Sequence, residues 1–341
     1  MKKLLYLSAI MIIAFAYLAG CKQDPSSSNG TMTMTTNTTT SAHPAWAFTS
    51  LKTVNSYGYT TIAVSDSDGT NATNVYTSAL NDTKLKTSSA SWSASGGSVS
   101  FIETTSGSWG ATSIKSVDVS VSGGVVSGSN VQTIYSRATS DSTSIRAQAW
   151  SQTSSVAKIA FIARTPTDDG VYLVSTSGGT ATKIYSIAKS SGYLGTSITW
   201  SNDGTKIAFI EQDGTSASHT SAIKVINTSG TVQATLESGT FTAIGNVTWS
   251  HTGTDMIAFN ARTTTTNYTT DNYLYQISPV SGSTSSKIIQ GSNPRWSPNN
   301  SELVYNIANT LTNAGTNKVT VGTGASTFVG TYIGYGDWKQ Q

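Results

Sequence analysis

Charged side chains are scarce in this sequence. Its 341 residues include 20 Lys or Arg and 17 Asp or Glu, so 11% of the chain is charged, compared with about 25% in an average soluble domain. Lys2 and Lys3 belong to an N-terminal segment that we expect to be removed, which leaves 18 basic and 17 acidic side chains. Because nucleic-acid binding needs an excess of basic groups, this near-neutral balance excludes an electrostatic nucleic-acid binder.

Cysteine and histidine are also nearly missing. Cys21 is the only cysteine, so the chain cannot form an internal disulfide. The three histidines, His43, His219 and His251, do not have the spacing of a zinc motif. The sequence contains no G-x-S-x-G nucleophile motif and no glycine-rich loop that opens a helix. We therefore expect no catalytic residues, no cofactor and no enzymatic activity.

Serine and threonine are abundant instead. The chain has 54 Ser and 55 Thr, together with 30 Gly, and 37% of its residues are hydrophobic. Glycine and the hydrophobic residues together reach the apolar share of an ordinary globular domain. This composition is sufficient for a hydrophobic core and excludes a globally disordered chain.

The N-terminus has the features of an export signal. Two lysines precede an apolar run at residues 4–18, which is shorter than the roughly 20 residues that a membrane-spanning helix needs. The segment Leu18-Ala19-Gly20-Cys21 resembles the lipobox of bacterial lipoproteins. The resemblance implies that residues 1–20 are a signal peptide and that lipid on Cys21 anchors the chain in a membrane. The alternative is an ordinary signal peptide with an unmodified cysteine beside it.

A polar linker follows the cysteine. Of the 16 residues from Ser26 to Ser41, 11 are Ser or Thr. Such a segment cannot pack, so we expect residues 21–43 to form a flexible tether with a reach of roughly 25 Å. By resemblance to enteric lipoproteins, Lys22 implies transfer to an outer membrane. The expected location is therefore the outer membrane, at its periplasmic face or at the cell surface.

The rest of the chain contains a repeat that is marked by tryptophan. Successive marker tryptophans are 46, 58, 50, 49, 47 and 42 residues apart. They are Trp46, Trp92, Trp150, Trp200, Trp249, Trp296 and Trp338. Most of them open a common phrase, such as WSNDGTKIAF from Trp200 and WSPNNSELVY from Trp296, whereas the copy from Trp46 is degenerate. Such regular intervals indicate a repeat fold in which these tryptophans pack in the core or between repeats.

Each copy of the repeat predicts four short strands. Asp203-Gly204 favours a tight turn between two strands, and Ile207-Ala208-Phe209 is typical of a strand that is covered on both faces. A third and a fourth strand follow, as at 170–179 and 183–185. Four short strands in about 50 residues, without helical periodicity, predict an all-β propeller.

The phrase resembles the WSPDGxxIAF repeat of TolB-type β-propellers. The likeness covers roughly residues 44–341, with Asn202 in place of the proline in one copy. Six intervals between tryptophans predict six blades, with the segment from Gly336 to Gln341 closing the ring beside the first blade. Seven blades are the alternative, if the segments at Trp46 and Trp338 form an extra blade.

The resemblance also implies partners. TolB works beside a peptidoglycan-associated lipoprotein and inner-membrane proteins in maintenance of the cell envelope. We expect this chain to depart from that pattern, because it has its own lipobox-like segment and leaves no room for an α/β domain between the tether and the propeller. Its membership of that system is therefore not implied.

Candidate binding residues lie in the loops after the second strand of each blade. Loops of this kind gather at one end of a propeller axis, and they contain Trp109, His219 and Tyr268. Exposed aromatic residues are common anchors in interfaces. The alternative for the two aromatic residues is a side chain that folds back over its own loop.

Charges of alternating sign end the second strands of four successive copies. They are Glu103, Arg164, Glu211 and Arg262. We expect these residues to form a belt of ion pairs between neighbouring blades. The alternative is that Arg164 and Arg262 are free to bind an anionic ligand group through bidentate contacts.

One turn resembles part of a calcium loop. Asp66, Asp68 and Asn71 supply oxygen atoms at suitable spacings, but the loop lacks the terminal glutamate of a full calcium motif. The same residue types are common in ordinary hairpin turns. We therefore expect a plain turn here, with a weak calcium site as the alternative.

These features predict a lipid-anchored, monomeric cell-envelope propeller that binds an envelope protein or a glycan without catalysis. One alternative is a structural protein or adhesin that uses a Ser/Thr-rich exterior. Another is an enzyme acting on polysaccharide, with Glu103, Asp168 and Glu211 as its carboxylates.

Overall fold

Antiparallel strands account for all of the regular structure in the part of the chain that the computed structural model describes. The described residues are 45–54, 57–67, 70–77, 85–105, 112–137, 144–213, 220–263, 271–307, 315–330 and 336–339. All of them lie in one of the two units into which the chain divides, Thr40–Gln341. They form 24 strands in six four-stranded sheets. Within these residues, no helix is long and apolar enough to cross a membrane.

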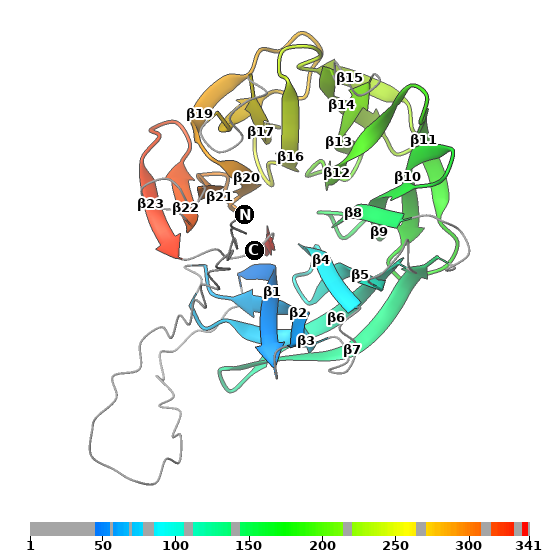
Figure 1. The fold of residues 1–341 in the computed structure, drawn as a ribbon. Coiled ribbons are helices and arrows are strands. Elements are labelled where there is room, and N and C mark those ends of the chain that lie inside the picture. Colours follow the sequence, from blue (N-terminus) through cyan, green and yellow to red (C-terminus); the bar gives the residue numbers. More distant parts are fainter. Residues whose placement is uncertain are drawn as a thin grey trace, which may run out of the picture. The chain divides into compact units, whose positions relative to one another are not determined.

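The six sheets are the blades of a propeller, with one strand of each sheet at the common axis (Figure 1). Blade 1 consists of β24 (Gly336–Trp338), β1 (Trp46–Val54), β2 (Tyr57–Ser65) and β3 (Thr73–Thr77). Blade 2 consists of β4 (Leu85–Trp92), β5 (Ser98–Thr105), β6 (Thr112–Ser122) and β7 (Val125–Ser136). Blade 3 consists of β8 (Ser144–Trp150), β9 (Lys158–Arg164), β10 (Asp168–Ser175) and β11 (Thr182–Ala188).

The remaining three blades repeat this order. Blade 4 consists of β12 (Gly192–Trp200), β13 (Lys206–Asp213), β14 (Thr220–Asn227) and β15 (Val232–Leu236). Blade 5 consists of β16 (Ala243–Trp249), β17 (Ile257–Arg262), β18 (Tyr273–Ile277) and β19 (Ser286–Gln290). Blade 6 consists of β20 (Ser292–Trp296), β21 (Glu302–Ile307), β22 (Gly315–Thr320) and β23 (Ser326–Gly330).

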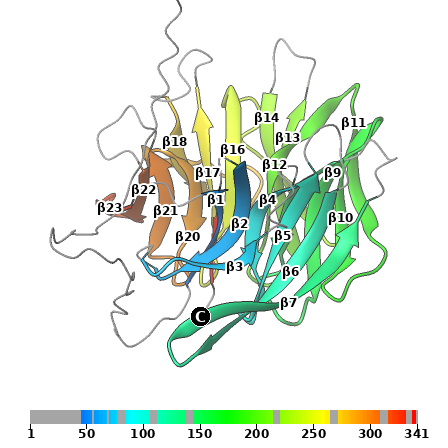
Figure 2. The same ribbon diagram turned by 60° about the horizontal axis from the view of Figure 1, so that its bottom comes forward.

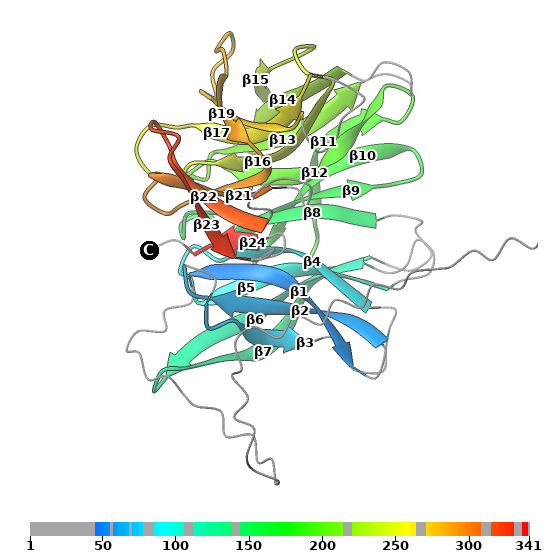
Figure 3. The ribbon, with the colours of Figure 1, turned by 60° about the vertical axis from the view of Figure 1, so that its left-hand side comes forward.

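Both ends of the propeller chain meet in blade 1. The last strand, β24, lies beside β1 (Figure 3). The two strands pair in antiparallel register, with Trp338 opposite Trp46. Trp338 thus ends an innermost strand, as the other marker tryptophans do, whereas Trp46 begins a second strand. The prediction of six blades closed by the C-terminal segment is confirmed. The seven-blade alternative is wrong, because the two segments share one blade.

The hydrophobic core lies between neighbouring blades. Trp249 of blade 5 packs with Ile210 and Ile223 of blade 4, and Trp200 of blade 4 packs with Ala160 of blade 3. The same arrangement closes the ring, because Trp338 packs with Val304 of blade 6. Each tryptophan therefore joins its blade to the one before it.

A serine follows five of the marker tryptophans and closes the next turn. The Ser201 backbone N–H donates to the Lys206 carbonyl at 2.9 Å, and the Lys206 N–H donates to the Ser201 hydroxyl at 2.9 Å. Gly204 sits in this turn with a φ of 69°, a conformation that glycine adopts without strain. Ser297 makes the same pair of contacts with Glu302. The Trp-Ser pair thus links inter-blade packing to a turn.

Polar side chains also join the inner strands. The Asp337 carboxylate accepts from the backbone N–H of Trp92 at 3.0 Å and from the Ser91 hydroxyl at 3.1 Å. The Ser91 hydroxyl in turn accepts from the Trp150 N–H at 3.1 Å. A chain of hydrogen bonds therefore runs from blade 1 through blade 2 to blade 3.

Outer hairpins of some blades pack on the preceding blade. The long β6–β7 hairpin lies along the rim next to β3 (Figure 2). A Cβ atom on Gly128 of this hairpin would lie 2.0 Å from the Val75 carbonyl oxygen of blade 1. A Cβ on Gly230 of blade 4 would likewise lie 1.8 Å from the Ile184 carbonyl oxygen of blade 3. Only glycine permits approaches this close.

Candidate functional site

The structure describes four of the nine residues that the sequence offered as candidates for lipidation, ligand binding or calcium. Arg164, Arg262, Asp66 and Asn71 lie in described segments. The others lie outside the described residues: Cys21, Asp68, Trp109, His219 and Tyr268. Arg262 ends β17 and is partly buried.

The calcium-like turn is closed by direct hydrogen bonds. The Asn71 amide donates to Asp66 Oδ2 at 2.6 Å, and the Asp66 backbone N–H donates to the Thr70 carbonyl at 3.0 Å. Asn71 has a φ of 53°, which asparagine tolerates in turns. Across the described segments, no group of three or more His, Cys, Asp or Glu has an arrangement that could hold a metal ion. Asp68, the third residue of the calcium alternative, lies outside the described residues, so both interpretations stay predictions.

The expected belt of ion pairs between blades is wrong at three of its members. Glu103 pairs with Lys115 on the neighbouring strand of blade 2. Glu211 pairs with Lys224 on the neighbouring strand of blade 4, at 3.4 Å. Arg164 pairs with Asp169 inside blade 3. Cross-strand neighbours in one sheet are closer than charges on separate blades, so each charge is paired within its own sheet.

Tyrosine hydroxyls, instead, connect these carboxylates across the blade boundary. Tyr76 of blade 1 donates to Glu103, and Tyr185 of blade 3 donates to Glu211. Burial and the neighbouring carboxylate raise the pKa of both phenols. The Tyr185 ring also packs on Phe209, with ring centres 5.2 Å apart. The sequence analysis missed these contacts because the partners are 27 and 26 positions apart in the chain.

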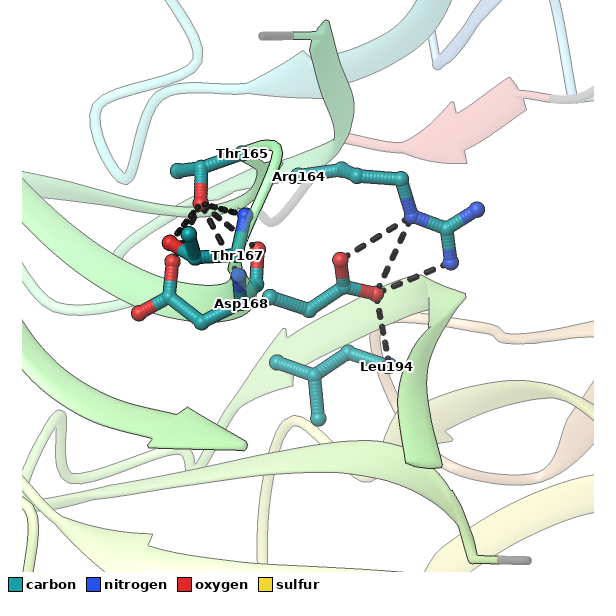
Figure 4. A network of polar contacts seen from close by, with 6 residues as sticks. Arg164, Thr165, Thr167, Asp168 and Leu194 are labelled. Carbon is teal, nitrogen blue, oxygen red and sulfur yellow. Dashed lines mark hydrogen bonds and ion pairs between the residues drawn. The ribbon is translucent and has the colours of Figure 1, made fainter. Parts of the chain in front are cut away.

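The strongest polar cluster lies between blades 3 and 4 (Figure 4). The Arg164 guanidinium donates from Nε to Asp169 Oδ1 and from Nη2 to Asp169 Oδ2, both at 2.9 Å. Asp169 is fully buried and also accepts from the backbone N–H of Leu194 in blade 4, at 3.0 Å. Hydrogen bonding to Asp169 raises the pKa of Arg164. Two of the three Arg164 nitrogens are therefore already engaged within the protein.

Asp168 is held in a second pair beside this cluster. Its carboxylate accepts from Lys183 Nζ at 2.7 Å and from the Thr165 hydroxyl. These hydrogen bonds lower the pKa of Asp168. Asp168, Glu103 and Glu211, the carboxylates of the enzyme alternative, thus each have a lysine partner on their own blade.

Arg146 is a member of the same site that the sequence analysis did not identify. It lies on β8, the innermost strand of blade 3, where the pairing with β9 shifts between Ile145 and Ala147. This bulge places Arg146 close to the end of β9, because Ser144 pairs with Arg164. Sequence periodicity does not reveal a bulge, so the proximity of the two arginines could not be predicted.

The environment of Arg146 is unfavourable for a cation. Its Nε atom is buried and makes no hydrogen bond to any residue in the described part of the chain. Burial lowers the pKa of Arg146, and the charge of Arg164 lowers it further, while Asp169 and Tyr193 oppose this effect. The Arg164 guanidinium lies 5.6 Å from the centre of the Tyr193 ring. The site therefore contains two guanidinium groups, one buried carboxylate and an aromatic ring.

A separate groove lies between blades 5 and 6, at the end of the ring that carries the Trp-Ser turns. Its volume is about 300 Å³. It is lined by Ser250, Thr252, Gly253, Thr254, Met256, Gln276, Trp296, Asn299, Asn300 and Val321. None of these side chains is charged, so the groove offers shape and neutral hydrogen bonds rather than charge.

The fold is similar to that of solved TolB structures. No protein-family model matches the chain, and no curated protein matches it in sequence. TolB from Acinetobacter baumannii matches with a TM-score of 0.61 and 15% identity over 87% of this chain and 67% of that chain. A putative TolB from Agrobacterium tumefaciens matches with a TM-score of 0.51 and 14% identity over 85% of this chain and 90% of that chain.

Enzymes occur among the weaker matches. A puromycin-hydrolyzing peptidase from Mycobacterium tuberculosis has a TM-score of 0.43 and 11% identity, over 83% of this chain and 36% of that chain. At such identities a likeness establishes the fold and not the activity. The chain is thus a six-bladed β-propeller similar to the propellers of TolB proteins.

Proposed function

We propose that this chain is a non-catalytic binding module of the bacterial cell envelope, which presents one end of its propeller to an envelope protein or a glycan. The observation that carries the proposal is the pairing of charges at the end where the second strands terminate. Glu103, Asp168 and Glu211 are each paired there with a lysine of their own blade, and Asp169 is paired with Arg164. Within the described residues, the Nε atom of Arg146 has no hydrogen-bond partner. Unpaired donors serve recognition, while a hydrolase needs carboxylates that are free to transfer protons.

The similarity to TolB propellers supports the same proposal. Those structures match the fold of this chain over 87% and 85% of its length, and a ring of this kind holds its loops on a rigid scaffold that is suited to binding. The lipobox-like segment ending at Cys21 and the polar linker after it would keep such a module at the outer membrane.

Site-specific photo-crosslinking in intact cells tests the binding role. A crosslinking side chain at Thr167, exposed in the turn between β9 and β10, should form a discrete adduct with a protein or a glycan. The control is Ser154, exposed in the turn between β8 and β9 at the opposite end of the same blade. Adducts that are absent at both positions, or equal at both, would contradict a binding surface at the proposed end.

The membrane anchor has its own test. Metabolic labelling with a fatty acid should mark the wild-type chain and not a Cys21→Ser variant. The reason is that Cys21 is the only thiol in the sequence. Equal labelling of both proteins would contradict lipidation at this residue.

A further inference from the structure

Arg146 occupies a position that the folded protein alone does not explain. A buried N–H donor without a hydrogen-bond partner destabilises a protein, because the lost hydration is not replaced. The Arg146 side chain is half-buried, and its Nε atom is in this situation. A nearby like charge adds to the cost, and Arg164 is such a charge. Unfavourable groups of this kind are often retained because a ligand uses them.

The two guanidinium groups are held at one place by different parts of blade 3. Arg146 projects from the bulge in β8, and Arg164 ends the adjacent strand β9. The Asp169 carboxylate fixes the Arg164 side chain through Nε and Nη2, so that only Nη1 is left without a partner among the described residues. The Arg164 guanidinium is therefore rigidly oriented. The Arg146 side chain has an unpaired Nε and is partly accessible.

The local balance of charge is positive. Asp169 is a carboxylate whose charge acts on Arg146, and it already accepts three hydrogen bonds from Arg164 and one from Leu194. Glu211 and Asp168 at this end of the ring are already paired with Lys224 and Lys183. An incoming anion would thus meet a net positive site without displacing an internal ion pair.

We propose that Arg146 and Arg164 bind an anionic oxygen group, a carboxylate or a phosphate, of the molecule that this propeller recognises. Two guanidinium groups match such planar or tetrahedral oxygen groups through charge-assisted hydrogen bonds. The Tyr193 ring beside Arg164 supplies an aromatic surface for the rest of the ligand. This inference rests on the binding role proposed above and names the chemistry that the bound molecule must present.

Direct titration of the purified full-length protein in detergent tests the site. The probes are inorganic phosphate and acetate, each compared with chloride at equal ionic strength, by calorimetry and thermal unfolding. We expect at least one probe to bind the wild type and to raise its melting temperature. Arg146→Gln should weaken that binding about tenfold or more, because a hydrogen bond to a charged group is lost. A preference for phosphate indicates a phosphorylated ligand, and a preference for acetate indicates a carboxylate.

A matched control separates this effect from a change in net charge. Lys158→Gln also removes one positive charge from blade 3, but Lys158 is exposed at the start of β9, at the opposite end of that strand. This variant should bind the probes like the wild type. Without a probe, Arg146→Gln should melt no lower than the wild type, since it removes an unfavourable cation.

Two results would overturn the inference. One is a wild type that binds phosphate and acetate no better than chloride; the other is an Arg146→Gln variant that binds them as tightly as the wild type. If crosslinking from Thr167 still captures a partner in these cases, the binding role stands and only its anionic chemistry is wrong. If anions bind but no adduct forms at Thr167, the site is correct and the proposed partner role loses its support.

Discussion

At the scale of single residues, the serine of each Trp-Ser pair is as important as the tryptophan. Ser201 is fully buried, and its hydroxyl accepts the Lys206 backbone N–H at 2.9 Å. Ser151, Ser250 and Ser297 are buried in the same way in other blades. A buried N–H that loses its acceptor costs more than an average hydrogen bond contributes.

Replacement of Ser201 should therefore destabilise the propeller. We expect Ser201→Ala to lower the free energy of unfolding by about 1–2 kcal/mol. Thr205 lies in the same turn with an exposed side chain, so Thr205→Ala should cost less than about 0.5 kcal/mol. Urea denaturation followed by tryptophan fluorescence measures both. Equal effects of the two variants would mean that the serine does not secure the turn.

The stability of the protein should also depend on the protonation of His251. This side chain is buried, and its Nε2–H donates to the Trp296 carbonyl at 3.2 Å. Burial lowers the pKa of His251, and the nearby charge of Asp337 only partly opposes this shift. An unfolded histidine has a pKa of about 6.5, so the unfolded chain binds the proton more readily. The contribution of His251 to the free energy of unfolding is thus complete above about pH 6.5 and is lost as the pH falls.

This dependence can be isolated with a neutral variant. His251→Gln should lower stability at pH 7.5, because it disturbs a packed site, but should remove part of the decline between pH 7 and pH 5. The urea midpoint of both proteins, measured across this pH range, gives the slope of stability against pH for each of them. Parallel slopes would show that His251 does not titrate on unfolding.

Some residues could be predicted from the sequence better than others. The tryptophans were predicted as packing residues, and most are buried, Trp92, Trp200, Trp249 and Trp296 among them. Arg164 was expected to face another blade or a ligand, yet Asp169, five positions away, holds it. The antiparallel register between β9 and β10 makes these two residues direct partners. Such pairs can be predicted only once the loop length between two strands is known.

At the scale of secondary structure elements, close contacts at the rim fix the outer hairpins. Gly128 on β7 faces the Val75 carbonyl of blade 1 so closely that any side chain would require the backbone to move. The β6–β7 hairpin is therefore attached to blade 1 as well as to its own blade. Nothing in the repeat pattern indicates this contact, because β6 and β7 extend beyond the strands of the other blades.

Substitution of Gly128 should loosen this attachment. We expect Gly128→Val to lower the free energy of unfolding by about 1–3 kcal/mol, as overpacking does elsewhere. Ser127→Val is the control, because the Ser127 side chain is exposed on the same strand. Hydrogen exchange of β3 and β7 should rise in the first variant only. Unchanged exchange in the Gly128 variant would mean that the hairpin tolerates a shift without cost.

The element order was predictable from the repeat, except in the first blade. Four strands per copy and the turn after each tryptophan follow from the phrase itself, and the structure confirms the four-stranded sheets. The copy at Trp46 looks degenerate because it does not begin a blade at all. Its strand is the second one of blade 1, and the first one comes from the other end of the chain. A pattern read along the sequence cannot show that two distant segments share one sheet.

At the scale of the whole molecule, closure of the ring is what turns six sheets into one fold. Sheets whose faces are covered only by neighbouring sheets have no independent core, and the clusters of this protein span adjacent blades. The short strand β24 supplies the innermost strand of blade 1. Its Asp337 carboxylate binds Ser91 and Trp92 of blade 2, so it also connects blade 1 to the next blade.

Loss of β24 should therefore destabilise the entire ring rather than one blade. A chain that ends at residue 335 loses the Trp338–Trp46 contact, with ring centres 5.4 Å apart, and leaves an inner edge of blade 1 unpaired. Trp338→Ala alone should cost about 3–5 kcal/mol, and the truncation at least as much. A chain that ends at residue 339, and a chain without residues 22–41, should both melt like the full protein. Near-ultraviolet circular dichroism during thermal unfolding reports on tryptophans of all blades together. A truncated protein that keeps the wild-type melting temperature and cooperativity would show that the ring does not depend on its closing strand.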